Sequence, residues 1–238
     1  MPARLYVDQP LQADAILTLP PGPARHVQVL RLQPGAEIVL FNGTGGEWRA
    51  TVHQMGRSEV QVRLHAHDPV DRELPHRITL AIGMPANERM DALIEKATEL
   101  GVAAIHPLLT ERSVLRLSGE RAEKRLAHWR GVAMAACEQS GRTRLPELAP
   151  VCSLAEWLRD MPSVASEQRC VLSPRASRKL AAVVGPAVFL SGPEGGLSDA
   201  EEAAAVAAGF AAVSLGPRVL RADTAPLAVL AHLALASF

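Results

Sequence analysis

The 238-residue sequence predicts a small β-barrel at residues 1–70, followed by an open, mainly parallel α/β sheet at residues 71–238. The first part contains several stretches in which apolar and polar residues alternate, a pattern that is typical of half-buried strands. The second part alternates short apolar runs with segments of helical periodicity, which is typical of βαβ units and of parallel strands. A charged segment with two prolines, residues 68–77, separates the two patterns and indicates a linker.

The predicted barrel consists of short strands and one short helix. Three stretches have the alternation of strands and are separated by glycine-containing turns: residues 36–41, 47–54 and 58–65. The PPGP motif at residues 20–23 indicates a loop, and a short helix is expected at about residues 26–32. Several short strands with a single helix favour a small barrel.

The second part is predicted to alternate strands and helices to the end of the chain. Buried-type strands are expected at residues 77–83, 102–109, 169–174, 187–192 and 211–216. Helices are expected at residues 88–101, 119–139, 153–161, 198–209 and from about 224. Ser153 with Glu156, and Ser198 with Glu201, have the spacing of capping boxes. This order predicts a sheet with helices on both faces.

The composition excludes several classes of protein. Lys+Arg and Asp+Glu both number 25, which argues against a strongly basic nucleic-acid binder, although a local basic patch remains compatible. The three cysteines form no CxxC pair, so neither a disulfide framework nor a zinc site is expected. His65 and His67 are the one close histidine pair and are interpreted as solvated, so no metal is expected. Without a leader pattern or a long apolar run, the chain is expected to be cytoplasmic.

Two loops that follow predicted strands are the candidate ligand-binding segments. SGPEGG at residues 191–196 and LGPRVLRADTA at residues 215–225 both lead into helices. Ligands of open parallel sheets bind where the strands end, and glycines allow close approach to the backbone. One glycine-rich loop could be only a tight turn, but two at the same edge favour a pocket. Neither loop has the GxGxxG or GxxxxGK[ST] pattern, so a nucleotide pyrophosphate or triphosphate is not indicated.

Several stretches together resemble the ribosomal RNA small subunit methyltransferase E family, which belongs to the SPOUT class of S-adenosylmethionine (AdoMet) methyltransferases. The stretches follow the family order over essentially the whole chain: residues 26–48, 99–113, 135–142, 190–201 and 215–228. The first of them resembles the PUA-like barrel of that family. The resemblance implies a trefoil knot in the second domain, a homodimer with the site near its interface, and methylation of N3 of one uridine in 16S ribosomal RNA, within the small subunit.

The resemblance also implies that AdoMet is held by the two glycine-containing loops. The residues expected to bind it are Leu190, Ser191, Gly192, Glu194, Gly195, Gly196, Leu215, Gly216, Val219, Leu220, Arg221 and Ala225. The N3 proton of uridine must leave before or during methyl transfer, which calls for a carboxylate or for a cation near the ring oxygens. The candidate catalytic residues are Arg112, Glu138, Glu194, Arg221 and Asp223, and the general base is left open among the three acids.

Binding of RNA requires contacts to phosphates. Residues 111–144 contain eight arginines and lysines against four glutamates. The residues expected to contact RNA are Arg4, Arg25, His26, Arg31, Arg89, Arg112 and Arg142. Because aromatic residues make up only 3% of the chain, recognition is expected to rest on shape, phosphates and one extruded uridine rather than on extensive stacking.

The chain departs from the family pattern at two places. Residues 85–90 read PANERM, where the family usually has a basic residue and a glycine before Asp-Arg-Met. Asp223 stands where the family usually has glutamate. Two alternatives to the main reading remain open: a SPOUT enzyme that acts on another RNA or on a ribose 2′-hydroxyl, and a non-catalytic RNA-binding or ribosome assembly factor.

Overall fold

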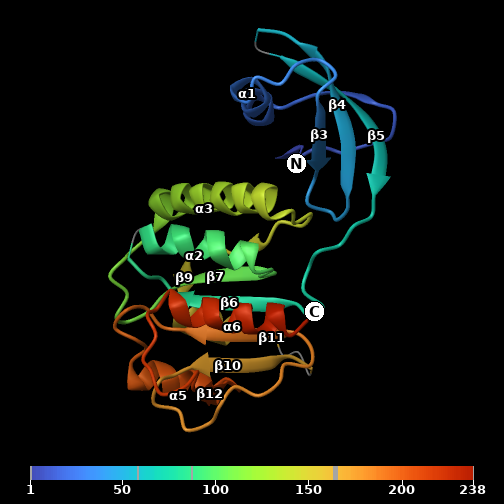
Figure 1. Cartoon of the computed structure of the whole chain (residues 1–238). Coiled ribbons are helices and arrows are strands. Elements are labelled where there is room, and N and C mark those ends of the chain that lie inside the picture. Colours follow the sequence, from blue (N-terminus) through green and yellow to red (C-terminus); the bar gives the residue numbers. More distant parts are fainter. Residues whose placement is uncertain (1, 58, 87, 163–165, 238) are drawn as a thin grey trace. The chain divides into compact units, whose positions relative to one another are not determined.

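The computed structural model describes residues 2–57, 59–86, 88–162 and 166–237 (Figure 1). Two residues named in the sequence predictions lie outside these ranges: Ser58, at the start of a predicted strand, and Asn87, in the PANERM stretch that differs from the family pattern. The chain divides into two compact units. The first comprises Met1–Glu73 with Cys137–Leu145, and the second comprises Leu74–Ala136 with Pro146–Phe238.

The first unit contains a five-stranded sheet and one helix. The strands are β1 (Ala3–Tyr6), β2 (Ile16–Thr18), β3 (Glu37–Phe41), β4 (Glu47–Met55) and β5 (Val60–Asp68). Their order is β1-β3-β4-β5-β2, with β1 parallel to β3 and the other neighbours antiparallel. The sequence predicted β3, β4 and β5, but β1 and β2, which have only four and three residues, are too short to show a clear alternation.

The start of helix α1 (Pro21–Val29) corrects the prediction of a loop at residues 20–23. The first N–H groups of a helix have no partner inside it, so proline is tolerated in the first turn, and its fixed φ suits the helix. The first helical hydrogen bond runs from the Ala24 N–H to the Pro20 carbonyl, at 2.9 Å. The helix therefore starts and ends earlier than the predicted residues 26–32, because PPGP begins the helix instead of preceding it.

The end of α1 is a Schellman motif in which Arg31 occupies the position that usually holds glycine. Arg31 has a φ of +55°, in the left-handed region. The Arg31 N–H donates to the Gln28 carbonyl and the Leu32 N–H donates to the Val27 carbonyl, at 3.0 and 3.2 Å. A residue with a Cβ is disfavoured in this conformation by roughly 1–2 kcal/mol.

Replacing Arg31 with glycine is expected to raise the free energy of unfolding by about 0.5–1 kcal/mol, because glycine relieves the left-handed strain but gains entropy in the unfolded chain. The same substitution at Arg25, which is exposed in the interior of α1, is the matched control and should lower the free energy of unfolding by about 1 kcal/mol. Urea unfolding followed by circular dichroism measures both. A loss of stability in Arg31→Gly would contradict the strain argument.

The second unit contains a parallel sheet. Its strands are β6 (Ile78–Gly83), β7 (Ala104–Leu109), β8 (Glu147–Leu148), β9 (Cys152–Ser153), β10 (Gln168–Leu172), β11 (Ala187–Ser191) and β12 (Ala211–Val213). The order is β12-β10-β11-β6-β7-β8, with β9 also paired to β7, and every pairing is parallel. The predicted parallel α/β sheet is confirmed, while the two-residue strands β8 and β9 were not predicted.

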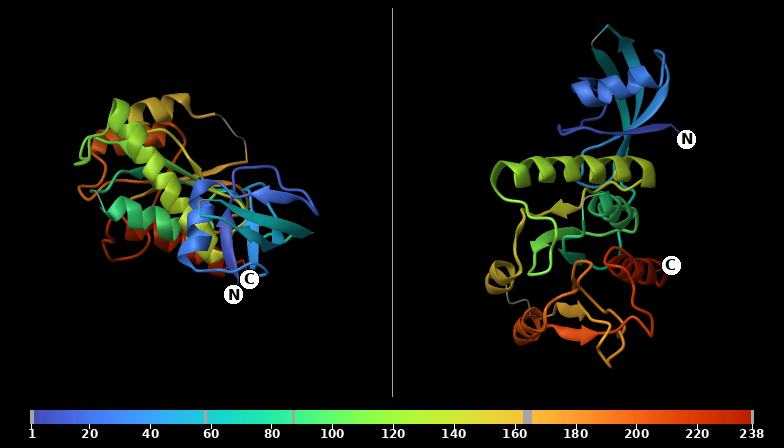
Figure 2. Two further views of the ribbon diagram at one scale, coloured as in Figure 1. Left: turned by 90° about the horizontal axis from the view of Figure 1, so that it is seen from above. Right: turned by 90° about the vertical axis from the view of Figure 1, so that its left-hand side faces the viewer.

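Helices cover both faces of this sheet, as the alternation predicted. They are α2 (Glu88–Glu99), α3 (Gly119–Ser140), α4 (Leu154–Asp160), α5 (Asp199–Ala207) and α6 (Thr224–Leu235). One face packs on α2, α3 and α6 through a core that includes Phe189, and the opposite face packs on α4 and α5 through a core that includes Leu190. The right-hand view of Figure 2 shows α2 and α6 on one side of the sheet and α4 and α5 on the other.

Both predicted capping boxes are present at the helices of the second face. Ser153 Oγ accepts the Glu156 N–H at 3.2 Å, and Ser198 Oγ accepts the Glu201 N–H at 3.3 Å. These caps satisfy N–H groups that would otherwise lack partners at the helix starts. Across the described ranges, none of the helices is long and apolar enough to cross a bilayer.

Candidate functional site

A cavity of about 490 Å³ lies at the carboxyl edge of the parallel sheet. Segments that follow β10, β11 and β12 line it, together with Arg89 of α2 and the start of α6. Parallel strands end at the same edge, so loops that are far apart in the sequence meet there. The volume lies within the range of roughly 300–1,000 Å³ that is usual for small-molecule sites.

The structure brings together eleven of the twelve residues that the sequence assigned to the cofactor. They are Ser191, Gly192, Glu194, Gly195, Gly196, Leu215, Gly216, Val219, Leu220, Arg221 and Ala225. Leu190 does not line the cavity: its side chain is fully buried in the core beneath α4 and α5. Residues 172–174 also line the cavity and were not predicted to do so, although β10 was predicted. The missing information was the strand order, which places β10 between β11 and β12.

The glycine loop, residues 191–197, is packed backbone against backbone. A Cβ on Gly192 would lie 2.6 Å from the Leu197 nitrogen and 2.7 Å from the Gly196 carbonyl carbon. A Cβ on Gly83, at the end of β6, would lie 2.6 Å from Pro193 Cδ. Glycine is therefore required at both positions by the loop itself, before any ligand is considered.

Ser191 offers the cavity an unpaired hydroxyl. The residue is 3% exposed and lines the cavity. Its Oγ has no hydrogen-bond partner in the part of the chain that the structure describes. Buried polar groups normally have a partner, so a ligand with a polar group at this depth would satisfy the hydroxyl.

Glu194 connects the glycine loop to the start of α2. Its Oε1 accepts the Ala86 N–H at 3.1 Å and is 3.2 Å from Arg89 Nη1. The bond at Ala86 uses the main chain, so the departure from the family pattern at this residue leaves it intact. Arg89, which the sequence assigned to RNA, has its guanidinium paired with Glu194 at the cavity wall.

Arg112 supports the glycine loop from outside the cavity. Its Nη1 donates to the carbonyl oxygens of Gly195 and Leu197, at 2.8 and 3.3 Å. The neighbouring Glu111 N–H donates to Glu201 Oε1 at 2.7 Å, which ties the end of β7 to the capping box of α5. Arg112 was predicted to act in catalysis and RNA binding. Its Nη1 is engaged with loop carbonyls and the residue does not line the cavity, but Arg112 is exposed, so both roles stay predictions.

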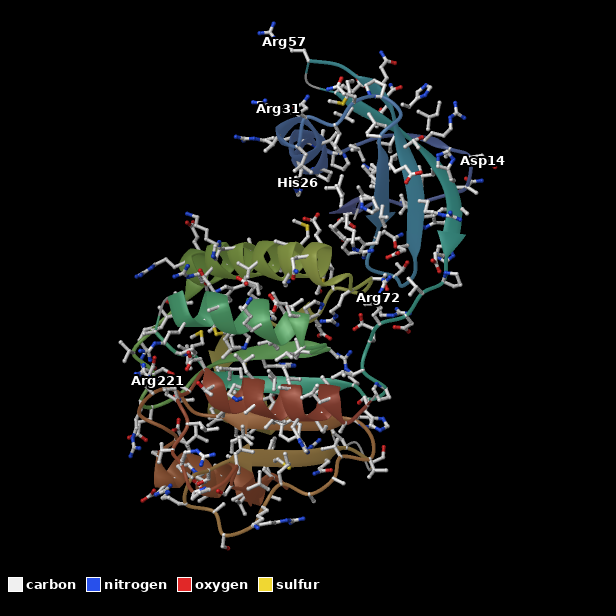
Figure 3. The ribbon with its side chains drawn as sticks, in the orientation of Figure 1. Asp14, His26, Arg31, Arg57, Arg72 and Arg221 are labelled. Atoms are coloured by element: carbon white, nitrogen blue, oxygen red, sulfur yellow. The ribbon has the colours of Figure 1, made fainter. Side chains whose placement is uncertain are left out.

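The loop before α6 places Arg221 and Asp223 differently. Arg221, labelled in Figure 3, lines the cavity, and its carbonyl accepts the N–H groups of Thr224 and Ala225, both at 3.0 Å. Asp223 does not line the cavity, and its Oδ1 accepts the Thr224 N–H at 3.1 Å as the N-cap of α6. Asp223 therefore caps the first N–H of α6, and its catalytic role stays a prediction.

Glu138 belongs to the first unit rather than to the cavity lining. Its Oε1 accepts the Tyr6 N–H at 2.9 Å, and its Oε2 lies 4.0 Å from His26 Nδ1. Burial raises the pKa of Glu138 above 4.5, and this effect exceeds the opposing effects of the Tyr6 hydrogen bond, His26 and Arg4. The contacts of Glu138 are structural, so its predicted catalytic role is not supported.

Replacing Glu138 with glutamine should make stability less dependent on pH. The folded pKa of Glu138 is raised, so its contribution is full below about pH 4.5 and is lost as pH rises through the folded value. Glutamine keeps an acceptor for the Tyr6 N–H and does not titrate. The variant should therefore gain stability relative to the parent chain between pH 4.5 and 7, as measured by thermal unfolding, with methyl transfer unchanged. A variant that unfolds normally but has lost methyl transfer would restore the catalytic role.

Two other arginines of the first unit also act within it. Arg4 pairs with Glu47 and donates to the carbonyls of Gly141 and Arg142, both at 3.1 Å. Arg142 is 3% exposed and pairs with Glu73. Neither guanidinium is presented to phosphate, which corrects the RNA contacts expected of them. Arg25, His26 and Arg31 are exposed on and after α1, where Figure 3 labels the last two.

Comparisons with known proteins agree with this architecture. A family model described as an RNA methyltransferase domain matches residues 72–234, and one described as an RNA methyltransferase PUA domain matches residues 24–64. A ribosomal RNA small subunit methyltransferase E from Synechocystis sp. is 35% identical over 98% of this chain and 77% of its own length. The protein of that name from Bacillus subtilis is 30% identical over 84% of this chain and 82% of its own length.

Two crystal structures superpose on almost the whole chain. A ribosomal RNA small subunit methyltransferase E from Neisseria gonorrhoeae, bound to S-adenosyl methionine, has a TM-score of 0.92 and 36% identity, covering 99% of this chain and 98% of its own. A putative methyltransferase from Legionella pneumophila, in complex with SAM, has a TM-score of 0.92 and 35% identity with the same coverage. Fold, cavity and family models together define an RNA methyltransferase. The chain belongs to the ribosomal RNA small subunit methyltransferase E family.

Proposed function

We propose that this protein transfers the methyl group of AdoMet to N3 of a specific uridine in 16S ribosomal RNA of the small ribosomal subunit. The observation that carries the proposal is the cavity built by the glycine loop and the loop before α6. It occurs in a chain that is 36% identical to a relative crystallised with S-adenosyl methionine. AdoMet would supply an electrophilic methyl group at this edge of the sheet.

The residues of the cavity fit such a cofactor. Ser191 supplies a buried hydroxyl without a described partner, and Gly192 and Gly196 bring backbone groups to the wall. Leu215 and Leu220 add apolar surface beside them. This mixture of apolar lining and a few oriented polar groups is the usual composition of a small-molecule site.

Glu194 is the acid that we assign to the N3 proton of uridine. Of the three acids considered from the sequence, it lines the cavity, whereas Glu138 and Asp223 do not. Both of its hydrogen bonds to other described residues fall on Oε1, so Oε2 can accept the N3–H of a bound uracil. Arg89 would then hold the carboxylate in place during the transfer.

The division of labour between the domains is part of the same proposal. Residues 1–70 would form a PUA-like barrel that binds RNA, and residues 71–238 would form the methyltransferase domain with a trefoil knot around the glycine loop. We propose the knot on the basis of the family to which the chain belongs. We also propose a homodimer, in the cytoplasm, on the basis of the same family.

The test is methyl transfer in vitro with isotopically labelled AdoMet. Small ribosomal subunits and naked 16S RNA from a strain that lacks the enzyme serve as substrates, and the product is digested and analysed by mass spectrometry. Label in 3-methyluridine is the expected result. Label in a 2′-O-methyl nucleoside or in another RNA would contradict the assignment to uridine N3. If calorimetry detects no binding of AdoMet, the protein acts without catalysis and the proposal fails.

A further inference from the structure

Two arginines of the second unit, Arg218 and Arg221, differ from the other arginines near the cavity. Arg89 pairs with Glu194, and Arg112 donates to loop carbonyls. Arg218 and Arg221 line the cavity and are exposed. Within the described ranges, neither side chain has an ion pair or a hydrogen bond. Both guanidinium groups are therefore at the rim and available to a ligand.

The charge of the cavity wall does not match AdoMet alone. Its charged lining residues are Arg89, Glu194, Arg218 and Arg221, and the first two neutralise each other. Two uncompensated positive charges remain at the rim. AdoMet itself carries a net positive charge, so it does not compensate this excess. The excess charge is complementary to an anion that approaches the same cavity.

The loop that carries the two arginines is anchored at both ends. The Ser214 hydroxyl donates to the Gly216 carbonyl at 3.1 Å, and the Arg221 carbonyl receives two N–H groups from the first turn of α6. Val219, between the arginines, is 81% exposed. The loop thus presents two forked cations on a fixed backbone, the geometry that suits bidentate contacts to phosphate oxygens.

We propose that Arg218 and Arg221 form a phosphate-binding subsite at the rim of the cavity. They bind the backbone phosphates on either side of the nucleotide whose base enters the cavity. This inference rests on the proposed function, because it takes the anion to be RNA. The subsite holds the extruded nucleotide by its backbone phosphates, which are the same in every sequence, while Glu194 faces the base.

The test measures binding of 16S RNA over a range of salt concentrations for Arg218→Gln and Arg221→Gln. Each variant should weaken RNA binding about tenfold at low salt and reduce the slope of log K against log salt by about 0.7–0.9. The affinity of Arg218→Gln for AdoMet, by calorimetry, should stay within about twofold, since a cofactor of net positive charge gains nothing from that cation. Arg218→Lys should keep most of the slope. Arg159→Gln, exposed on α4, is the matched control and should change neither quantity.

Two results would overturn the subsite. One is an unchanged salt slope in both glutamine variants, and the other is a loss of AdoMet affinity in Arg218→Gln with RNA binding intact. Failure of the proposed function is distinguishable, because it would appear in the parent chain as an absence of methyl transfer. The salt slope of binding needs no turnover, so it decides the subsite in either case.

Discussion

Replacing Gly192 with alanine is expected to lower the rate of methyl transfer at least about 100-fold, since displacing a site by about 1 Å has effects of this size. The added Cβ would lie 2.6 Å from the Leu197 nitrogen and 2.9 Å from Gly196 Cα, far inside van der Waals contact. Both atoms are main chain, so no side-chain rotation relieves the clash. The glycine loop must open, and the wall formed by Ser191, Gly195 and Gly196 moves with it.

The matched control is the same substitution at Gly131, in α3, where nothing lies within 4 Å of an added Cβ. Gly131→Ala should retain full activity and gain about 0.5–1 kcal/mol of stability, because alanine favours the helix. AdoMet affinity by calorimetry and methyl transfer by label incorporation compare the two variants. Normal affinity and activity in a folded Gly192→Ala protein would show that the loop can relax without harm.

Replacing Arg142 with alanine is expected to lower the free energy of unfolding by about 3 kcal/mol, the size seen when one partner of a buried ion pair is removed. The Arg142 side chain is 3% exposed, and its Nε and Nη2 both contact the carboxylate of Glu73. The Glu73 side chain is 17% exposed. The variant leaves Glu73 largely buried without this cation. The first unit, which contains both residues, should therefore unfold at a lower urea concentration.

Arg159→Ala provides the comparison for this experiment. Arg159 also forms a two-pronged pair, with Asp160, but both side chains are well exposed at 69% and 65%. Its removal should leave the unfolding midpoint unchanged, because exposed ion pairs contribute little. RNA binding by Arg142→Ala, measured where the variant is fully folded, should keep the parent salt slope. A reduced salt slope in the folded variant would show that Arg142 contacts RNA.

The location of the cavity could be predicted because it depends on local sequence patterns, namely the alternation of strands and helices and the glycine-rich loops. Strands and helices alternate from residue 77 onward, and this alternation requires parallel strands whose carboxyl ends share an edge. Glycine-rich loops after two of those strands then identify the cavity. The strand order, and with it residues 172–174, could not be predicted, since no local signal states which strands become neighbours.

The roles of individual charged residues were predicted less well than the loops. Arg4 and Arg142 are arginines, as Arg218 and Arg221 are, but their guanidinium groups are largely buried in pairs with Glu47 and Glu73 and are not presented to RNA. Those partners lie far away in the sequence. Apolar periodicity and glycine turns are local properties, so the sequence by itself determined the fold class and the cofactor loops. Charge pairing is a long-range property, so only the tertiary structure decided which polar residues hold the protein together and which face the cavity.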